Sequence, residues 1–465
     1  MTGSSTTSDR GDALVLFGIT GDLAKKMLLP ALYELSLQGT LPDRVIGVTH
    51  GGWSLERLRQ HARESVAARE PLDEAAFARF AGRLRLATID YDDPDSFQAI
   101  AAEADGCRLV AHYLAVPPTL YARAAELLAK AGLNVGARLA VEKPFGHDLA
   151  SARALEAELT RYFPEDRLLR VDHFLGKDAV ENLLTFRIAN TLLNAALQPP
   201  FMRSVQITLA EDFGVSDRGG FYDGTGALRD VVQNHLLQTL AYFVMEAPRT
   251  GSAQDILDER ARALKSVRTV LPQDYVRGQY AGYLDVPGVR PQSRTETYAA
   301  LRTWVDTDRW AGVPFTVRTG KALAVRATEI VVELQRPTPG YHHTACTQQI
   351  TPDLVRLRIS PRPGADFDLF AQHGADPAQV EPVVAAADFT GLGGDSVAYQ
   401  HVFTAVLSGD TRRFVSMPMV EESWRIVGDL LDADDQPFGY APGSDGPEQA
   451  ARLATDHRWL PLDAG

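Results

Sequence analysis

Two segments far apart in the sequence carry residues that could move a proton and hold an anion. The first, RVDHFLGK (Arg170 to Lys177), follows a predicted strand and places an arginine, an aspartate, a histidine and a lysine close together. The second, RDVVQNHLLQ, places His235 ahead of an apolar helical run. Taken alone, the first is more typical of a charged surface loop, and the second of a structural helix histidine. Together they supply an Asp–His pair for acid–base chemistry and cations for an anionic substrate.

A glycine-containing turn, GITGDLA (Gly18 to Ala24), lies between the first predicted strand and the helix after it. Gly18 and Gly21 let the main chain turn tightly and approach a pyrophosphate, and Thr20 offers a hydroxyl. The following helix N-terminus presents main-chain amides and the positive end of its dipole. The same spacing also occurs in ordinary strand-to-helix turns. Its position at the first strand–helix junction favours a dinucleotide site.

The residue after the second strand usually selects the coenzyme. An acidic residue there binds the ribose hydroxyls of NAD, and an arginine binds the 2′-phosphate of NADP. This chain has GVTHGG at that place, with His50 at the selecting position. Neither rule applies, so these residues leave the choice between NAD and NADP open.

The first half of the chain alternates short apolar strands with helical patterns, which is typical of βαβ units and a parallel sheet. The predicted strands are Ala13–Thr20, Val45–Thr49, Leu84–Ile89, Arg108–Val116 and Ala137–Glu142. The predicted helices are Asp22–Leu37, Ser54–Glu70, Ser96–Ala104 and Pro118–Ala131.

The second half changes to a period of two, which is typical of antiparallel strands with one solvated face. The predicted strands are Arg203–Gly214, Thr295–Asp306, Thr328–Gln335 and Leu354–Pro361, with a long apolar helix in GALRDVVQNHLLQTLAYFVMEAP. The stretch Gln372 to Gly394 is the most loop-like part of the interior. We therefore predict an α/β domain followed by an α+β domain. After a disordered leader (1–12), residues 13–175 form a Rossmann-like coenzyme-binding domain. Residues 176–465 form an α+β domain built on a large, mainly antiparallel sheet.

Composition and charge exclude several classes of protein. Lys and Arg total 47 against 60 Asp and Glu, a net charge of −13, which argues against a nucleic-acid binder. An anionic substrate must therefore meet a local cluster of cations. No apolar run approaches the length of a membrane span, and Cys107 and Cys346 are too few for a disulfide framework or a cysteine zinc site. We expect a cytoplasmic protein with no metal, membrane or nucleic-acid partner.

Several motifs, in this order, resemble one enzyme family. They are GITGDLAKK, YLAVPP, VEKPFG, RVDHFLGK, RDVVQNHLLQ, VRGQY, TETYAALR, RWAGVPFTVRTGKAL, SGDTRRFV and VEESWRIV. Over nearly the whole chain they resemble glucose-6-phosphate dehydrogenase. The resemblance implies oxidation of glucose 6-phosphate at C1 to 6-phosphoglucono-1,5-lactone with hydride transfer to NADP, the first step of the oxidative pentose phosphate pathway. It also implies a homodimer or homotetramer whose second domain binds the substrate and forms the oligomer.

The resemblance assigns roles to individual residues. His235 matches the family base, and Asp172 matches the carboxylate that holds its imidazole. The residues that match groups around the substrate are His173, Lys177, Glu211, Asp230, Lys321, Arg326 and Lys143. The residues that match groups around the coenzyme are Gly18, Thr20, Gly21, Asp22, Leu23, His50, Tyr113 and Lys143.

The chain also departs from the family pattern. Met27 replaces the third basic residue after the glycine turn, Phe174 replaces a tyrosine, His50 replaces an arginine, and Asp445 replaces a tryptophan. Two alternatives follow. One is a paralogue that uses NAD or another phosphosugar, and the other is a non-catalytic nucleotide-sensing protein. The presence of both Asp172 and His235 argues against the second alternative.

Overall fold

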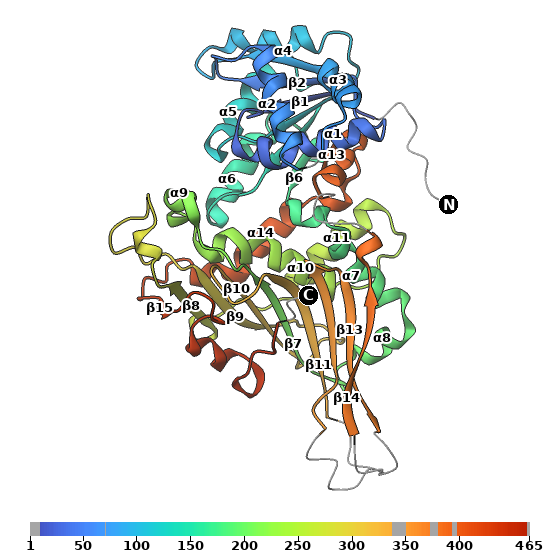
Figure 1. Ribbon diagram of the computed structural model, residues 1–465, viewed down its shortest axis with the longest axis vertical. Helices are drawn as coiled ribbons and strands as arrows, with labels where there is room; N and C mark the ends of the chain where they lie inside the picture. Colours follow the sequence, from blue (N-terminus) through green and yellow to red (C-terminus); the bar gives the residue numbers. More distant parts are fainter. Residues whose placement is uncertain (1–9, 70, 337–349, 373–379, 393–397, 463–465) are drawn as a thin grey trace. The chain divides into compact units, whose positions relative to one another are not determined.

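The computed structural model describes residues 10–69, 71–336, 350–372, 380–392 and 398–462. The chain divides into two compact units (Figure 1). Unit 1 comprises residues 1–177, 250–257 and 396–421, and unit 2 comprises residues 178–249, 258–395 and 422–465. Residues 398–421 thus pack with the N-terminal part of the chain, which a single division at residue 175 does not include.

Only part of the predicted leader can be described. Residues 1–9 lie outside the described residues, as do Cys346 and the segment around it. Residues 10–12 are held by hydrogen bonds: the Gly11 amide donates to the Leu407 carbonyl at 2.7 Å, and the Asp12 carboxylate accepts from the amides of Arg108 and Leu109.

In the described part of unit 1, the strands form one six-stranded parallel sheet in the order β3-β2-β1-β4-β5-β6. The strands are β1 (Ala13–Phe17), β2 (Arg44–Thr49), β3 (Leu84–Thr88), β4 (Val110–Leu114), β5 (Arg138–Glu142) and β6 (Leu168–Val171). This is the order of a doubly wound dinucleotide-binding sheet, whose direction of winding reverses between β1 and β4. The predicted Rossmann-like architecture is confirmed.

Helices cover both faces of this sheet. They are α1 (Leu29–Leu37), α2 (Leu55–Ala67), α3 (Glu74–Arg83), α4 (Gln98–Glu103), α5 (Tyr121–Lys130), α6 (Leu149–Leu159) and α13 (Ala398–Ser408). The predicted helix Asp22–Leu37 begins as a π-helix, η1 (Ala24–Leu28), and continues as α1. Helix α3 lies in a stretch for which no element was predicted. Helix α13 packs against α1 and supplies apolar side chains to the same core (Figure 1).

The described strands of unit 2 form one mixed sheet in the order β14-β13-β12-β11-β7-β10-β9-β8-β15. They are β7 (Met202–Ala210), β8 (Tyr275–Tyr280), β9 (Tyr298–Trp304), β10 (Pro314–Gly320), β11 (Ala327–Leu334), β12 (Leu354–Ser360), β13 (Gly364–Gln372), β14 (Val380–Asp388) and β15 (Phe438–Tyr440). The pairs β10–β7 and β15–β8 are parallel, and the other pairs are antiparallel.

The loop expected over Gln372 to Gly394 is wrong in part. Residues 380–388 form β14, which pairs antiparallel with β13 along its whole length. Strand β14 is an exposed edge strand, and its sequence VEPVVAAAD lacks the alternation of apolar and polar residues that marks a half-buried strand. Residues 373–379 and 393–397 lie outside the described residues.

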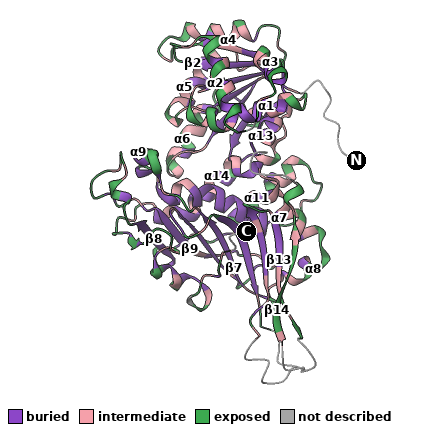
Figure 2. Cartoon of the chain, viewed as in Figure 1, coloured by how far each residue is buried: buried purple, intermediate pink, exposed green. Residues whose placement is uncertain are grey.

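One buried helical run covers the centre of this sheet. The π-helix η7 (Leu228–Leu236) packs on β7, β9 and β10 and continues as α10 (Leu237–Val244), which is buried throughout (Figure 2). The other helices are α7 (Asp178–Ala189), α8 (Thr191–Ala196) and α9 (Gly219–Asp223); the division between the units falls within α11 (Ala253–Lys265) and α14 (Met417–Val427). Among the described residues, no helix has the length and apolar character needed to cross a membrane.

Candidate active site

The glycine turn of unit 1 has the geometry of a phosphate-binding turn. Gly18 has a φ of 74°, and a Cβ atom there would lie 2.2 Å from the carbonyl oxygen of Ala115, so only glycine fits. The Gly21 amide donates to the Gly18 carbonyl at 2.9 Å. No described side chain caps the start of η1. The Lys25 amide donates to the Gly21 carbonyl at 3.0 Å, and the amides before it, at the start of the helical run, suit an anionic pyrophosphate. Asp22 is exposed, whereas Thr20 and Leu23 are half-buried.

The end of β2 carries a cation that the sequence analysis missed. His50 is exposed, and its Nδ1 lies 3.2 Å from the carbonyl oxygen of Ile89. Arg57, in the first turn of α2, donates to the Gly52 carbonyl at 3.1 Å. Its guanidinium lies 4.4 Å from the centre of the Trp53 ring, which restrains it. The sequence signal was available: an arginine one helical turn beyond the glycine pair that follows β2.

A buried carboxylate lies at the end of β5. Glu142 accepts hydrogen bonds from the hydroxyls of Tyr113 at 2.5 Å and Tyr399 at 3.2 Å. Burial raises the pKa of Glu142 to about 7, against the lowering effect of these hydrogen bonds and of Lys143. Tyr113 is fully buried, and its hydroxyl is engaged by Glu142. Lys143, the next residue along, is half-buried.

The segment after β6 forms a tight turn, η5 (His173–Gly176). Asp172 is fully buried and caps this turn, because its Oδ1 accepts from the Phe174 amide at 3.0 Å. The Lys177 ammonium lies 4.9 Å from the centre of the Phe174 ring. The phenylalanine therefore retains a ring beneath Lys177 while lacking a hydroxyl. The turn brings Asp172, His173 and Lys177 together.

Helix α13 supports this turn from a distant part of the sequence. The ring of Tyr399 stacks on His173 with 5.5 Å between the ring centres and 6° between the planes. Gly176 approaches so closely that a Cβ atom there would lie 2.4 Å from the Ala398 carbonyl oxygen. Arg413 donates to the Gly176 carbonyl at 3.0 Å and adds a cation beside the turn. Neither Tyr399 nor Arg413 was predicted, because nothing in their local sequence links them to residues 172–177.

Unit 2 groups four of the other predicted residues. Lys321 forms an ion pair with Glu211, with 2.5 Å between Nζ and Oε2. Lys321 and Asp230 line a cavity of about 190 Å³, here called the Lys321 pocket, whose wall includes residues 213–218 and Tyr222. Arg326 adjoins the same wall, since its guanidinium lies 5.9 Å from the centre of the Phe213 ring.

His235 lies in the last turn of η7, on the same helix as Asp230. It is buried, with a relative exposure of 6%. Its main chain is fixed at both ends: the amide donates to Asn234 Oδ1 at 2.7 Å, and the carbonyl accepts from the Thr239 hydroxyl at 2.7 Å. π-Helical turns are rare and are frequent at functional sites. Here one holds two of the predicted site residues.

Comparison with known proteins shows the family to which the chain belongs. The protein-family model described as "Glucose-6-phosphate dehydrogenase, NAD binding domain" matches residues 15–182. The family model described as "Glucose-6-phosphate dehydrogenase, C-terminal domain" matches residues 184–460. The chain belongs to the glucose-6-phosphate dehydrogenase family. It is 43% identical over 455 residues to glucose-6-phosphate 1-dehydrogenase 1 of Mycobacterium tuberculosis, covering 97% of each chain.

Solved structures of the family share its fold. The crystal structure of glucose-6-phosphate 1-dehydrogenase from Mycobacterium avium matches with a TM-score of 0.90 and 43% identity, covering 98% of this chain and 100% of that one. A glucose-6-phosphate dehydrogenase in complex with its substrate glucose 6-phosphate matches with a TM-score of 0.89 and 30% identity, covering 98% and 99%. The predicted family and the expected fold class are confirmed, and the dinucleotide-binding fold indicates a nicotinamide coenzyme.

At one departure from the family pattern, the structure places another basic side chain close to the missing one. Where the family has its third basic residue, this chain has Met27. The Arg69 guanidinium lies 2.9 Å from Met27 Sδ and donates to the Lys26 carbonyl at 2.5 Å. A positive charge is thus present beside position 27, carried by the turn that follows α2 instead of by η1.

Proposed function

We propose that this protein oxidises C1 of β-glucose 6-phosphate to 6-phosphoglucono-1,5-lactone and transfers the hydride to NADP. One observation carries the proposal: a chain that matches the family over nearly its full length has His235, the residue that matches the family base, on a buried π-helix that also carries Asp230 to the Lys321 pocket.

The proposed chemistry needs a base near the C1 hydroxyl. His235 accepts the hydroxyl proton as the C–H bond breaks, and an imidazole is suited to this because its usual pKa lies near neutrality. Asp172, by its match to the family, is assigned the stabilisation of the charged imidazole. A bound nicotinamide supplies the hydride acceptor, so the chain itself needs to provide only orientation and a base.

The remaining residues recognise the substrate. His173, Lys177 and Arg326 are assigned to its phosphate, and several cations around one dianion explain how an acidic protein holds an acidic substrate. The Lys321–Glu211 ion pair offers a donor and an acceptor for sugar hydroxyls. Lys143 is assigned a place between substrate and coenzyme.

The coenzyme proposal rests on unit 1. Gly18, Gly21 and the uncapped start of η1 receive the pyrophosphate, with Thr20 as a further donor. NADP is proposed over NAD because Arg57 and His50 flank a glycine pair at the end of β2, and no acidic side chain occupies the selecting position.

An assay at 340 nm tests the proposal with glucose 6-phosphate, free glucose and fructose 6-phosphate, each with NADP and NAD. We expect the highest kcat/KM for glucose 6-phosphate with NADP. A clear preference for another phosphosugar, or for NAD, would favour the paralogue. Absence of turnover with every pair, with retained nucleotide binding, would favour the sensing protein.

Assembly and location complete the proposal. A cytoplasmic homodimer or homotetramer is expected from the resemblance to the family. Light scattering on the purified chain measures its mass in solution, and a mass equal to one chain of 50.7 kDa would contradict this.

A further inference from the structure

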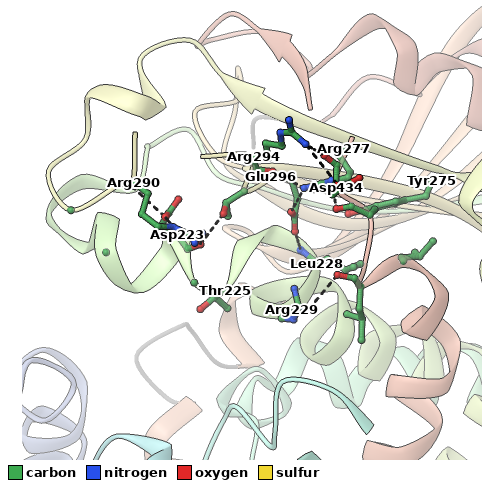
Figure 3. Close-up of a pocket in the computed structure, with 17 residues that line it drawn as sticks. Asp223, Thr225, Leu228, Arg229, Tyr275, Arg277, Arg290, Arg294, Glu296 and Asp434 are labelled. Carbon is green, nitrogen blue, oxygen red and sulfur yellow. Dashed lines mark hydrogen bonds and ion pairs between the residues drawn. The ribbon is translucent and has the colours of Figure 1, made fainter. Parts of the chain in front are cut away.

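Unit 2 contains a second, larger cavity of about 490 Å³ (Figure 3). We call it the arginine pocket, and it is formed by α9, the start of η7, β8, the loop before β9 and the segment after α14. The lining residues on which the inference depends are Asp223, Arg229, Tyr275, Arg277, Arg290, Arg294, Glu296 and Asp434. Its volume lies within the range of about 300–1,000 Å³ that is usual for small-molecule sites. None of the residues assigned above to substrate or coenzyme lines it.

The arginine pocket is basic in an acidic protein. Four arginines and three carboxylates are among its described lining residues, a local charge of +1, whereas the whole chain carries −13. Arginine is the side chain best suited to planar, bidentate contact with phosphate. The local sign of charge therefore favours an anion.

Two of the arginines hold their guanidinium groups at the mouth of the cavity. The Arg290 side chain is 73% exposed although its Nε is 2.6 Å from a buried oxygen of Asp223. The Arg294 side chain is 57% exposed and donates from one nitrogen to the Asp434 carbonyl at 2.6 Å. Each guanidinium has five N–H donors, so these contacts orient the groups and leave donors for a ligand.

Deeper in the cavity lies a hydroxyl donor. Within the described part of the chain, the Tyr275 hydroxyl is buried and makes no hydrogen bond. Burial, reinforced by Glu296, raises the pKa of Tyr275 well above its usual value. The hydroxyl therefore keeps its proton, and unpaired buried donors are uncommon in proteins. A polar ligand atom would provide the missing acceptor.

The arginine pocket and the Lys321 pocket share two structural elements. In α9, Gly220 and Asp223 line the arginine pocket, whereas Phe221 and Tyr222 line the Lys321 pocket. In η7, Leu228 and Arg229 line the first, and the next residue, Asp230, lines the second. Any shift of η7 thus moves residues that line both pockets.

Glu296 connects the arginines to η7 (Figure 3). Its Oε1 accepts from the Leu228 amide at 3.0 Å and caps the helix, while its Oε2 lies 3.4 Å from Arg277. Arg277 in turn donates to the Arg294 carbonyl at 2.5 Å. An anion that draws Arg294 toward itself acts on this chain of contacts, which ends at the helix that carries Asp230 and His235.

We propose that the arginine pocket binds a phosphorylated small metabolite and that this ligand regulates the Lys321 pocket through Glu296 and η7. The shared chemistry is a phosphate group on a molecule the size of a nucleotide or a sugar phosphate. The binding part is independent of the proposed function, whereas the regulatory part rests on it.

Calorimetric titration of the full chain tests the binding. The probes are inorganic pyrophosphate, AMP and fructose 1,6-bisphosphate, with citrate as an anion that lacks phosphate, each measured with excess glucose 6-phosphate present. We expect one site per chain for at least one phosphorylated probe, and the tightest probe distinguishes a nucleotide from a sugar phosphate. No binding, displacement by glucose 6-phosphate, or equal binding of citrate would overturn the proposal.

Three variants locate the site. Arg294→Gln should weaken binding about tenfold or more, and Asp434→Asn, whose side chain is 96% exposed, should strengthen it severalfold by removing a negative charge. The matched control is Arg268→Gln, since Arg268 is 56% exposed, pairs with an exposed Asp306 and does not line the pocket. Equal affinities in Arg294→Gln and Arg268→Gln would overturn the assignment.

Steady-state kinetics test the regulation. A saturating concentration of the tightest probe should change KM for glucose 6-phosphate or kcat at least twofold in the wild type and in Arg268→Gln, and should have no such effect in Arg294→Gln. Binding without any change in KM or kcat would overturn the regulatory part.

Discussion

The two π-helices, η1 and η7, differ in how their N-termini are satisfied. No described side chain caps η1, which follows the glycine turn and exposes Lys25 and Lys26. In η7 the Glu296 carboxylate accepts from the Leu228 amide, and most of the helix is buried. The start of η1 is thus available to a diffusible anion, whereas a side chain of the protein already occupies the corresponding position of η7.

This difference separates two uses of the same backbone geometry. An uncapped helix start binds phosphate through its amides and dipole. A capped helix start fixes the helix and so holds the side chains further along it, here those of Asp230 and the proposed base His235. Variants in each element should therefore affect different kinetic constants.

The largest effect is expected at His235. His235→Asn removes the proposed base on η7, so kcat should fall by roughly 10²–10⁴-fold, while the affinity for NADP, which is proposed to bind at η1, should not change. The control is Thr239→Val on the same helical run, which should lose less than about tenfold. Near-normal turnover of His235→Asn in the 340 nm assay would disprove the assignment of the base.

Next in size is Lys177. Loss of a charge-assisted contact costs about 1.5–3 kcal/mol, so Lys177→Ala should raise KM for glucose 6-phosphate by roughly 10- to 100-fold. Activity with free glucose should hardly change. Lys130→Ala, on the exposed face of α5, is the matched control. Equal losses with both sugars would show that Lys177 does not serve the phosphate.

Glu296→Gln tests the cap itself. The amide should hold the Leu228 amide less strongly, so the free energy of unfolding should fall by about 1–2 kcal/mol and kcat should fall with it. Asp148→Ala is the control, because Asp148 caps α6 in unit 1 and should cost similar stability without changing kcat. If both variants reduce kcat equally, the cap of η7 has no special connection with the chemistry.

The fourth expected effect, in order of size, is on the selectivity between NADP and NAD. If Arg57 holds the 2′-phosphate, Arg57→Ala should reduce the NADP preference in kcat/KM about tenfold, and Arg63→Ala, further along α2, should not. If His50 holds it instead, the preference stays within about 100-fold, roughly 2.7 kcal/mol, and rises in His50→Arg. Measuring kcat/KM for both coenzymes in the wild type and in the three variants separates the two cases.

The smallest expected effect concerns how the stability of unit 1 depends on pH, because the contributions of two buried groups, Glu142 and His112, nearly cancel. Burial raises the pKa of Glu142 from 4.5 to about 7, so the folded state binds the extra proton and stability falls as pH rises through this window. Burial lowers the pKa of His112 from 6.5 to about 4, so stability rises with pH between these values. Each effect is on the order of 3 kcal/mol at most.

Removing one group should reveal the other. Between pH 4.5 and 6.5 the wild-type free energy of unfolding should vary little from these two groups, whereas that of Glu142→Gln should rise with pH. Urea denaturation at a series of pH values measures this. A variant whose dependence on pH matches that of the wild type would show that Glu142 does not titrate in this range.

The sequence predicted the parallel sheet well and the mixed sheet in part. Strands such as β1 are buried on both faces, so their apolar runs are unambiguous. Strands β8, β10, β13, β14 and β15 were missed. For β8 the reason is that YVRGQY is buried yet rich in polar residues, and for β14 it is that VEPVVAAAD has no alternation. The π-helical character of η1 and η7 was not predicted either, because the spacing of apolar residues does not distinguish a short π-helix from an α-helix.

The candidate site divides in the same way. Residues within motifs, such as Asp172 and Lys177, were predicted because their neighbours in sequence are also their neighbours in space. Arg57, Tyr399 and Glu296 act on a turn, a ring or a helix end through tertiary contacts. Such contacts depend on the folded chain and have no local pattern.

Helix α13 has a consequence for synthesis on the ribosome. Val402, Phe403 and Val406 of this helix share a core with Leu14 and Leu32, and the Arg138 side chain donates to the carbonyl of Leu407 at 2.7 Å. The N-terminal unit therefore cannot close its core until residues 398–421 have left the exit tunnel. A fragment that ends at residue 177 would leave that apolar surface open to aggregation, so an isolated coenzyme-binding unit would need α13 joined back to it.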